Sequence, residues 1–202
     1  MSSHSASAVV APWRTGLPVL SGPMVSMREP VLEDTAAIAA VLAVGDATRF
    51  GIDDSTDENA AARLIDAAIR DRLAGSGFTF VVILTASRRI VGLVQVRRLD
   101  PTFECGEWEC TLAPAVRGSG VFVDTARAAM RFAFETVGIH RLETRVLVEN
   151  GRSNGAIRKI GGVHEGILRG AVRRGGTYLD QALWALLKDD WSAHVPDGSS
   201  VH

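Results

Sequence analysis

The chain has 202 residues, of which 47% are apolar, with 22 basic and 23 acidic side chains and a formal net charge of −1. This length favours one domain whose core is large enough to fold without a disulfide or metal. The near-zero charge argues against binding to nucleic acid or anionic membranes by bulk electrostatics. The longest apolar run, 36–44, is far too short to cross a bilayer, and no signal-peptide pattern precedes it, so we expect a cytoplasmic protein.

The two ends of the chain differ in composition from its middle. Residues 1–22 are rich in Ser, Ala, Pro and Gly and predict a flexible leader, and residues 193–202 predict a flexible tail. We therefore expect one domain over residues 23–192. Cys105 and Cys110 lie five residues apart, so on one strand they would point to opposite faces and form no disulfide. Without a nearby histidine they predict no metal site.

The spacing of apolar residues predicts the secondary structure. Asp34 or Thr35 would cap the first helix, and a capping box from Ser55 to Glu58 would open the second. The predicted elements, in chain order, are a strand at Met24–Arg28, helices at Leu32–Val44 and Ser55–Ala74, strands at Phe78–Ala86, Ile90–Arg98 and Phe103–Ala113, a long helix after the loop Pro114–Gly120, a strand at Arg141–Val148, a helix at Ser153–Ile160, and a hairpin of Val163–Val172 and Thr177–Leu187.

This order of elements predicts an α/β (α+β) fold. Its hairpins imply a mixed, mostly antiparallel central sheet of about seven strands, flanked by about four helices. One β-α-β crossover lies in the middle of the chain, at the long helix that follows Gly120. An exposed strand edge in such a sheet is compatible with a homodimer.

The loop Pro114–Gly120 is the most informative segment of the sequence. A strand that runs through a glycine-containing loop into a helix leaves backbone N–H groups beside the positive end of the helix dipole, which suits a phosphate. Gly118 and Gly120 would allow an anion to approach the backbone closely. The loop is not a Walker loop, because no Gly-Lys-Ser/Thr follows it. Val123 stands where a dinucleotide fingerprint has its third glycine.

Several further motifs occur with this loop in a fixed order. They are Val25-Ser-Met-Arg-Glu-Pro with Asp34, Ile90-Val-Gly, Glu107 seven residues before Pro114, Arg117-Gly-Ser-Gly120, Asn150-Gly-Arg-Ser153, Lys159-Ile-Gly161, Glu165-Gly-x-x-Arg169, Asp180, and Leu186-Leu187 before Trp191. In this order the chain, from about residue 24 to 191, resembles the GNAT superfamily of acetyl-CoA-dependent N-acetyltransferases, and within it the RimJ/RimL-like group.

The resemblance implies a GNAT fold that uses acetyl-CoA as a co-substrate and no metal. The acetyl group would pass directly to an amine, either a protein N-terminal α-amine or the amine of a small molecule. Acetyl-CoA would lie where the strand ending at Ala113 parts from Arg141–Val148, with its pantetheine arm and thioester oxygen on the backbone of 111–113. The residues implied to bind it are Thr111, Leu112, Ala113, Arg117, Gly118, Ser119, Gly120, Val121, Asn150 and Ser153.

The resemblance also implies catalytic roles. Glu107 would be the general base, directly or through water, with Glu109 as its same-face neighbour. Two close carboxylates would favour a proton on one of them, whereas the alternative is a pair of solvent-facing strand residues. Ser153 would act as general acid or thiol partner, or as the N-cap of its short helix. Asn150 would bind the pantetheine, or would be a turn residue before Gly151.

Four positions depart from the family pattern, and two of them are Phe122, where the residue after the loop is usually small, and Gly162, where an aromatic usually follows Lys-x-Gly. Ala115 stands where the pyrophosphate motif begins with Gln or Arg, and Ile157 stands where many members have a tyrosine general acid. These departures keep two alternatives open. One is a CoA-binding module of the same fold without catalysis, and the other is a transferase of a bulkier acyl group such as succinyl.

Overall fold

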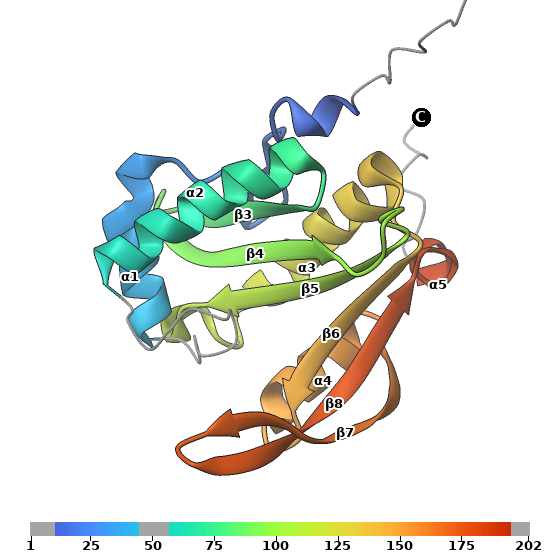
Figure 1. Cartoon of the computed structure of the whole chain (residues 1–202). Coiled ribbons are helices and arrows are strands. Elements are labelled where there is room, and N and C mark those ends of the chain that lie inside the picture. The colour runs from blue at the N-terminus through green and yellow to red at the C-terminus, as the bar shows by residue number, and fades with distance from the viewer. Residues whose placement is uncertain (1–10, 45–56, 195–202) are drawn as a thin grey trace, which may run out of the picture.

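A computed structural model describes residues 11–44 and 57–194 of the chain. These residues form one eight-stranded sheet in the order β1-β2-β3-β4-β5-β6-β8-β7 (Figure 1). All neighbouring strands are antiparallel except the pair β5–β6, so the predicted mixed sheet is confirmed, with one strand more than expected. The strands are β1 (Leu20–Ser21), β2 (Val25–Arg28), β3 (Gly77–Leu84), β4 (Ile90–Arg98), β5 (Cys105–Leu112), β6 (Arg141–Leu147), β7 (Val163–Arg174) and β8 (Thr177–Leu187).

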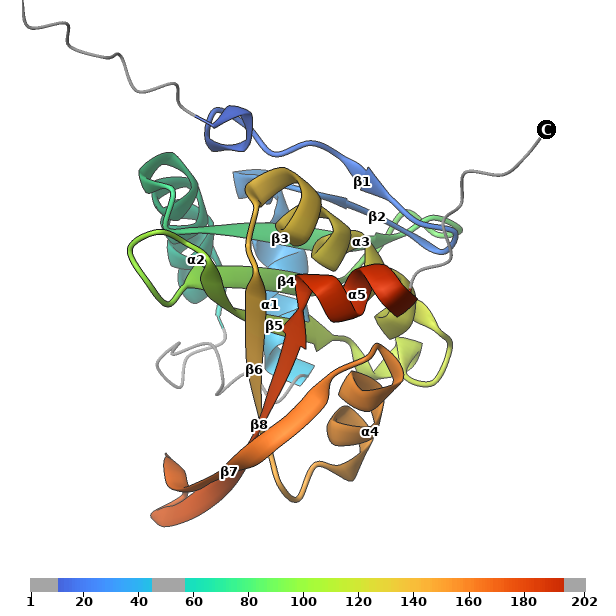
Figure 2. The same ribbon diagram turned by 90° about the vertical axis from the view of Figure 1, so that its right-hand side faces the viewer.

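Helices cover both faces of this sheet. Those in the described ranges are α1 (Thr35–Val44), α2 (Glu58–Ala74), α3 (Val121–Arg131, continued by a π-helical segment, Phe132–Val137), α4 (Gly151–Lys159) and α5 (Lys188–His194). Helices α1 and α2 lie on one face, whereas α3, α4 and α5 lie on the opposite face (Figures 1 and 2). None of the helices that the structure describes is long and apolar enough to cross a membrane.

The start of α2 differs from the expectation. Asp57 is the N-cap, and its side chain accepts a hydrogen bond from the backbone N–H of Ala60 at 2.8 Å. The predicted capping box that begins at Ser55 is therefore wrong, because the aspartate two residues later satisfies the helix terminus. Ser55 itself lies outside the described residues.

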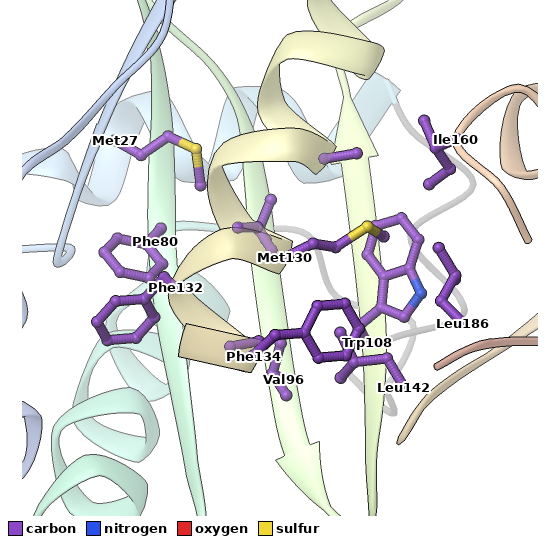
Figure 3. Close-up of a cluster of buried hydrophobic side chains, with 14 of the residues drawn as sticks. Met27, Phe80, Val96, Trp108, Met130, Phe132, Phe134, Leu142, Ile160 and Leu186 are labelled. Atoms are coloured by element: carbon purple, nitrogen blue, oxygen red, sulfur yellow. The ribbon is translucent and has the colours of Figure 1, made fainter. Parts of the chain in front are cut away.

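Alternation along the strands divides the core between the two faces. On the face that carries α1 and α2, Ile38, Leu42 and Ile65 pack against β3 and β4. On the face that carries α3, the larger core brings Trp108 and Met130 together with residues of neighbouring strands (Figure 3). Each such buried side chain stabilises the fold by roughly 1.5–3 kcal/mol, so both faces of β3, β4 and the start of β5 are firmly held.

The segment before β2 is part of the domain, contrary to the predicted leader over residues 1–22. Trp13 is 5% exposed and its ring packs edge-on against Phe78 and Phe103. Arg72 donates to the carbonyl oxygen of Arg14. The segment around Trp13 is interrupted by prolines and glycine and shows no regular period, which is why the pattern missed this contact. Residues 1–10 of that leader, and residues 195–202 of the predicted tail, lie outside the described residues, whereas residues 193–194 belong to α5.

Candidate active site

The sheet opens between β5 and β6. These two parallel strands pair at only three positions, Cys105–Arg141, Gly106–Leu142 and Glu107–Glu143. Beyond them the strands part, and β6 swings away together with β8 and β7 (Figure 1). The gap expected between the strand ending near Ala113 and its parallel neighbour is therefore present, and it begins directly after Glu107.

The backbone of β5 presents alternate residues to this gap. The N–H of Ala113 donates to the carbonyl oxygen of Val91 at 2.7 Å, which turns it toward β4. Because hydrogen-bonding direction alternates along a strand, Thr111 also faces β4, whereas Cys110 and Leu112 direct their N–H and C=O groups into the gap. Of the three residues expected to bind pantetheine through their backbone, Leu112 is the one whose polar groups are available.

The loop after β5 leaves the start of α3 without a side-chain cap. Gly120 is its N-cap residue in the left-handed region at φ 91°, and Gly118 has φ 77°. Within the described part of the chain, the N–H groups of Gly118, Gly120 and Phe122 have no hydrogen-bond acceptor. These groups and the dipole of α3 form an electropositive terminus that suits an anion. Exposed Arg117 adds a cation beside it.

Two of the expected loop residues are engaged within the loop. The Ser119 hydroxyl donates to the carbonyl oxygen of Val116 at 2.7 Å and accepts from the N–H of Val121 at 3.4 Å. The side chain of Ser119 therefore holds the turn, and the N–H of Val121 is partly occupied.

The N-terminus of α4 is capped by a side chain. The Asn150 Oδ1 atom accepts from the N–H of Ser153 at 3.0 Å, so Asn150 is the N-cap and the alternative role of Ser153 as the cap is wrong. The Ser153 hydroxyl has no hydrogen-bond partner among the described residues, and the residue is half-buried. Helices α3 and α4 contact each other, and each begins just after a strand that borders the gap.

The position where the family pattern would place a tyrosine belongs to the core. Ile157 is 4% exposed. A Cβ atom added at Gly162 would lie 2.4 Å from the Ile157 Cγ2 atom, so the small residue at 162 accommodates the branched one at 157. No phenol can therefore reach the gap from this turn of α4.

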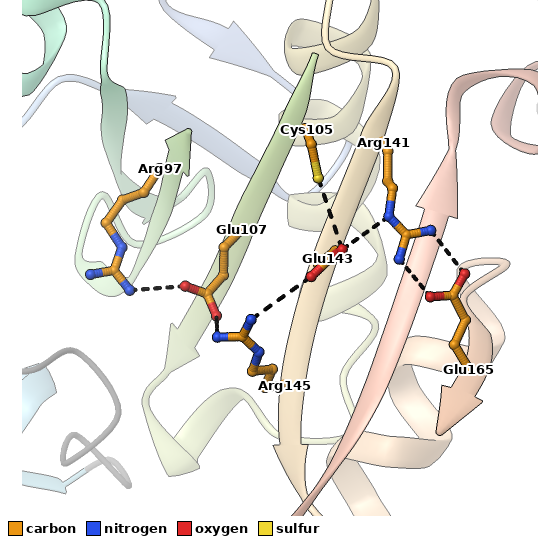
Figure 4. Close-up of polar contacts among 7 residues, drawn as sticks. All are labelled: Arg97, Cys105, Glu107, Arg141, Glu143, Arg145 and Glu165. Carbon is orange, nitrogen blue, oxygen red and sulfur yellow. Dashed lines mark hydrogen bonds and ion pairs between the residues drawn. The ribbon is translucent and has the colours of Figure 1, made fainter. Parts of the chain in front are cut away.

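Glu107 and Glu109 lie on the face of β5 that is turned away from α3. Glu107 belongs to a ladder of acidic and basic side chains (Figure 4). The Glu107 carboxylate is 12% exposed and is held on both sides, with Arg97 Nη2 3.2 Å from Oε2 and Arg145 Nη1 3.2 Å from Oε1. Arg97 Nη2 also lies 3.8 Å from Glu109 Oε1. The Arg97 guanidinium lies between the two carboxylates, and the alternative of two solvent-facing residues is wrong, because the Glu107 and Glu109 side chains are only 12% and 20% exposed.

The ladder continues across β6 to β7. Arg145 Nη2 lies 3.9 Å from Glu143 Oε2, and Arg141 binds both Glu143 and Glu165. The two hydrogen bonds from Arg141 hold the pKa of Glu165 below its usual value. Arg141, Glu143 and Arg145 alternate in sequence, a pattern that puts three charges on one face of a strand and would have indicated this ladder.

Both cysteines are free thiols on opposite faces of β5, as expected. Burial, reinforced by the nearby Glu143 carboxylate, raises the pKa of the Cys105 thiol. Burial alone raises the pKa of the Cys110 thiol to about 12. Neither thiol is poised as a nucleophile at neutral pH, because the thiolate is the reactive form.

Comparison with known proteins assigns this architecture to a family. Residues 25–163 match the family model described as the acetyltransferase (GNAT) domain. Two curated relatives are the uncharacterized N-acetyltransferase YnaD of Bacillus subtilis, 25% identical over 56% of this chain and 66% of the relative, and the ribosomal protein uS5-alanine N-acetyltransferase of Escherichia coli, 24% identical over 58% of this chain and 61% of the relative. The matched part thus spans less than two thirds of either relative.

A solved structure supports the same fold. Mycobacterium smegmatis RimJ in complex with CoA-disulfide superposes with a TM-score of 0.74, at 19% sequence identity, over 86% of this chain and 87% of that one. The structural similarity therefore covers more of this chain than the sequence similarity to the two curated relatives does, because the fold extends over nearly the whole domain.

Proposed function

This chain belongs to the GNAT acetyltransferase domain family, and we propose that it transfers the acetyl group of acetyl-CoA directly to an amine. The observation that carries the proposal is the gap between β5 and β6, which ends at the uncapped N-terminus of α3. A gap with free backbone groups suits the extended pantetheine arm, and an uncapped helix start suits the pyrophosphate. The gap and the adjoining helix start therefore offer backbone groups for both the pantetheine arm and the pyrophosphate of acetyl-CoA.

The residues proposed to hold acetyl-CoA fall into three groups. The N–H groups of Gly118 and Gly120 bind the pyrophosphate, with Arg117 supplying charge and Ser119 and Val121 holding the turn. The backbone of Leu112, flanked by Thr111 and Ala113, binds the pantetheine and thioester oxygen. The amide nitrogen of Asn150 donates to the pantetheine from the opposite side, because its oxygen is already used in the cap.

The amine reaches the thioester from the face that carries Glu107, because the opposite face of β5 is filled by the Trp108 core. The ammonium first loses a proton to Glu107, directly or through water, with Glu109 beside it. The amine nitrogen then attacks the thioester carbon, and an N–C bond forms as the C–S bond breaks. Backbone donors in the gap stabilise the negative oxygen of the tetrahedral intermediate.

The departing CoA sulfur needs a proton or a hydrogen-bond donor. We assign this role to the Ser153 hydroxyl, which borders the gap at the start of α4 and has no partner in the described chain. Cys110, Ile157 and Tyr178 fit the role less well, because the first packs against the core around Trp108, the second is apolar and the third is 68% exposed on β8.

Isothermal titration and a turnover assay test the proposal. We expect purified protein to bind acetyl-CoA and to release CoA thiol with at least one amine from a panel of peptide N-termini, polyamines and amino acids. No binding at millimolar acetyl-CoA would contradict the assignment. Binding without turnover across the panel would instead support a non-catalytic CoA-binding module, and faster turnover with succinyl-CoA would support a transferase of a bulkier group.

The role of Glu107 is tested by Glu107→Gln. Loss of a general base lowers kcat by about 10²–10⁴-fold and flattens its rise with pH. The matched control is Glu104→Gln, because Glu104 is an exposed carboxylate just before β5 with no side-chain partner in the described residues. An unchanged pH profile in Glu107→Gln would remove Glu107 from this role.

The names of the relatives indicate two acceptor classes for that panel. One is a protein N-terminal alanine, as in the uS5-alanine enzyme, and the other is a polyamine, as in the spermidine N(1)-acetyltransferase of Vibrio cholerae. The two free thiols fit a reducing compartment, which supports a cytoplasmic enzyme.

A further inference from the structure

We propose that Arg97 is a built-in counter-ion that the ammonium group of the acceptor displaces from Glu107 and Glu109. Arg97 is then a specificity-determining residue that selects primary amines carrying a positive charge when they bind. The inference rests on the proposed function, because it concerns the acceptor side of the same site.

The position of Arg97 is the first support. Arg97 on β4 stands directly opposite Glu107 on β5, and its Nη2 atom bridges Glu107 Oε2 at 3.2 Å and Glu109 Oε1 at 3.8 Å. The Arg97 side chain is 50% exposed, compared with 12% for Glu107 and 20% for Glu109. The guanidinium is therefore the outer member of the cluster, and an acceptor arriving from solvent meets it before it meets the carboxylates.

The contrast with Arg145 is the second support. Arg145 holds the other Glu107 oxygen from β6, also contacts Glu143, and has its Nε atom buried. It lies between Glu107 and Glu143, the last paired residues before β5 and β6 part, so its departure would leave two neighbouring carboxylates without the cation between them (Figure 4). Arg97 reaches only toward β5, within one well-paired hairpin, and can leave without changing that pairing.

The chemistry of proton transfer is the third support. A base must offer an oxygen to the amine within hydrogen-bonding distance, yet both oxygens of Glu107 are engaged in the free protein. A primary ammonium carries the same charge as Arg97 and also donates hydrogen bonds, so it can replace the guanidinium between the two carboxylates. A proton then passes from the ammonium to Glu107 Oε2, and the nitrogen keeps the electron pair that attacks the thioester. A neutral ligand cannot replace Arg97 in this way, because it does not balance the negative charge of Glu107 and Glu109.

The test compares Arg97→Gln with Arg98→Gln in the full chain saturated with CoA. Arg98 is the exposed neighbour on the same strand, with its side chain on the opposite face, so both variants lose the same charge. The probes are spermidine and a short peptide with a free N-terminal alanine, which separate a polyamine from a protein terminus. Binding is measured by titration calorimetry, and KM and kcat are measured with acetyl-CoA.

We expect Arg97→Gln to bind at least one of these probes about threefold more tightly than the unsubstituted protein, as the loss of one exposed competing ion pair implies. The KM for that amine should fall while the KM for acetyl-CoA stays the same, and Arg98→Gln should change neither. A purely structural role of Arg97 would instead weaken binding and lower kcat. Thermal unfolding of both variants shows whether the fold is retained, and Arg97→Met provides a second substitution without the charge.

Unchanged or weaker amine binding in Arg97→Gln, an equal gain in Arg98→Gln, or no binding of either probe to any of these proteins would overturn the inference. Failure of the proposed function is distinguishable, because it would appear as loss of acetyl-CoA binding in the unsubstituted protein. The calorimetric arm with CoA and amine gives its answer even if no acetyl transfer is seen.

Discussion

Two strand-to-helix turns border the gap, and they satisfy their helix termini in opposite ways. At the end of β6, Asn150 caps α4 through a hydrogen bond from the N–H of Ser153. At the end of β5, the glycine loop leads into α3 without a side-chain cap, and the N–H groups of Gly118 and Gly120 have no acceptor in the described chain. The first turn is complete within the protein, whereas the second requires water or a ligand.

The difference shows that an anion site depends on which helix terminus the chain leaves open. Both helices have a dipole, and α2 is capped by Asp57 in the same manner as α4. Only at α3, among these three, do glycines with positive φ take the place of a capping side chain. Substitutions at one turn at a time test this difference.

Among substitutions at the two turns, the largest effect is expected from Gly118→Asp. A carboxylate beside the α3 terminus would repel the pyrophosphate, and we expect the Kd for acetyl-CoA, measured by calorimetry, to rise at least tenfold, or about 1.4 kcal/mol. A Cβ atom at Gly118 has no neighbour within 4 Å, so the side chain itself fits.

Two controls isolate the charge and the turn. Gly118→Asn has nearly the same shape and tolerates the same positive φ without the charge, so it separates repulsion from backbone strain. Gly151→Asp adds the same carboxylate at the start of α4 and should change the acetyl-CoA affinity by less than about twofold. Equal losses of affinity from the two aspartates would show that the open turn is not the anion site.

A smaller effect is expected at the start of α4, which Asn150 caps. Asn150→Ala removes the cap of α4 and should lower the free energy of unfolding by about 1 kcal/mol, which is a Tm decrease of about 2–4 °C for a chain of this size. Asn150→Asp keeps the capping oxygen but loses the amide donor, so it should retain stability and lose affinity for CoA. If Asn150→Asp bound CoA as well as the unsubstituted protein, Asn150 would be a cap and no more.

Ser153→Ala should leave stability unchanged, because the N–H of Ser153 and not its hydroxyl takes part in the cap. We expect kcat to fall by up to about tenfold, and the Kd for acetyl-CoA to stay within twofold, if the hydroxyl assists the leaving thiolate. A lower Tm with unchanged kcat would reverse this assignment. Urea unfolding and steady-state kinetics on the same preparation measure both quantities.

The smallest effect concerns Cys110, which lies on β5 outside both turns. Its pKa is raised to about 12, so the neutral thiol dominates at neutral pH and only about one molecule in 10⁴ carries the thiolate at pH 8. Labelling of Cys110 by a disulfide reagent in a Cys105→Ser background should be slow, and should accelerate about tenfold per pH unit between 8 and 10. Rapid, complete labelling at pH 8 would contradict the burial of this thiol.

Local patterns were enough to predict most elements of the fold. Seven of the eight strands and the α3 loop follow from alternation and glycine placement, whereas the opening between β5 and β6 was expected only from the resemblance to the family. The packing of Trp13 and the cap of α2 were not predicted correctly. The contacts of one aromatic ring, and the choice between Ser55 and Asp57 as the cap, depend on which residues are neighbours in space. Sequence periodicity carries no information about such neighbours. At α4 the sequence suggested Ser153 as the cap and Asn150 as a turn residue, whereas Asn150 is the cap, since either side chain suits that place.

The sequence by itself determined the mixed sheet, which depends on spacing and order along one chain, and its motifs identified the family. The candidate residues from Glu107 to Ser153 come from that resemblance. The tertiary structure decided the partners of the charged residues. Arg97 and Arg145 come from strands on either side of β5, and only the register of β4 and β6 against β5 brings their guanidinium groups to Glu107. Electrostatic contacts depend on distance in space, and separation in sequence does not specify that distance.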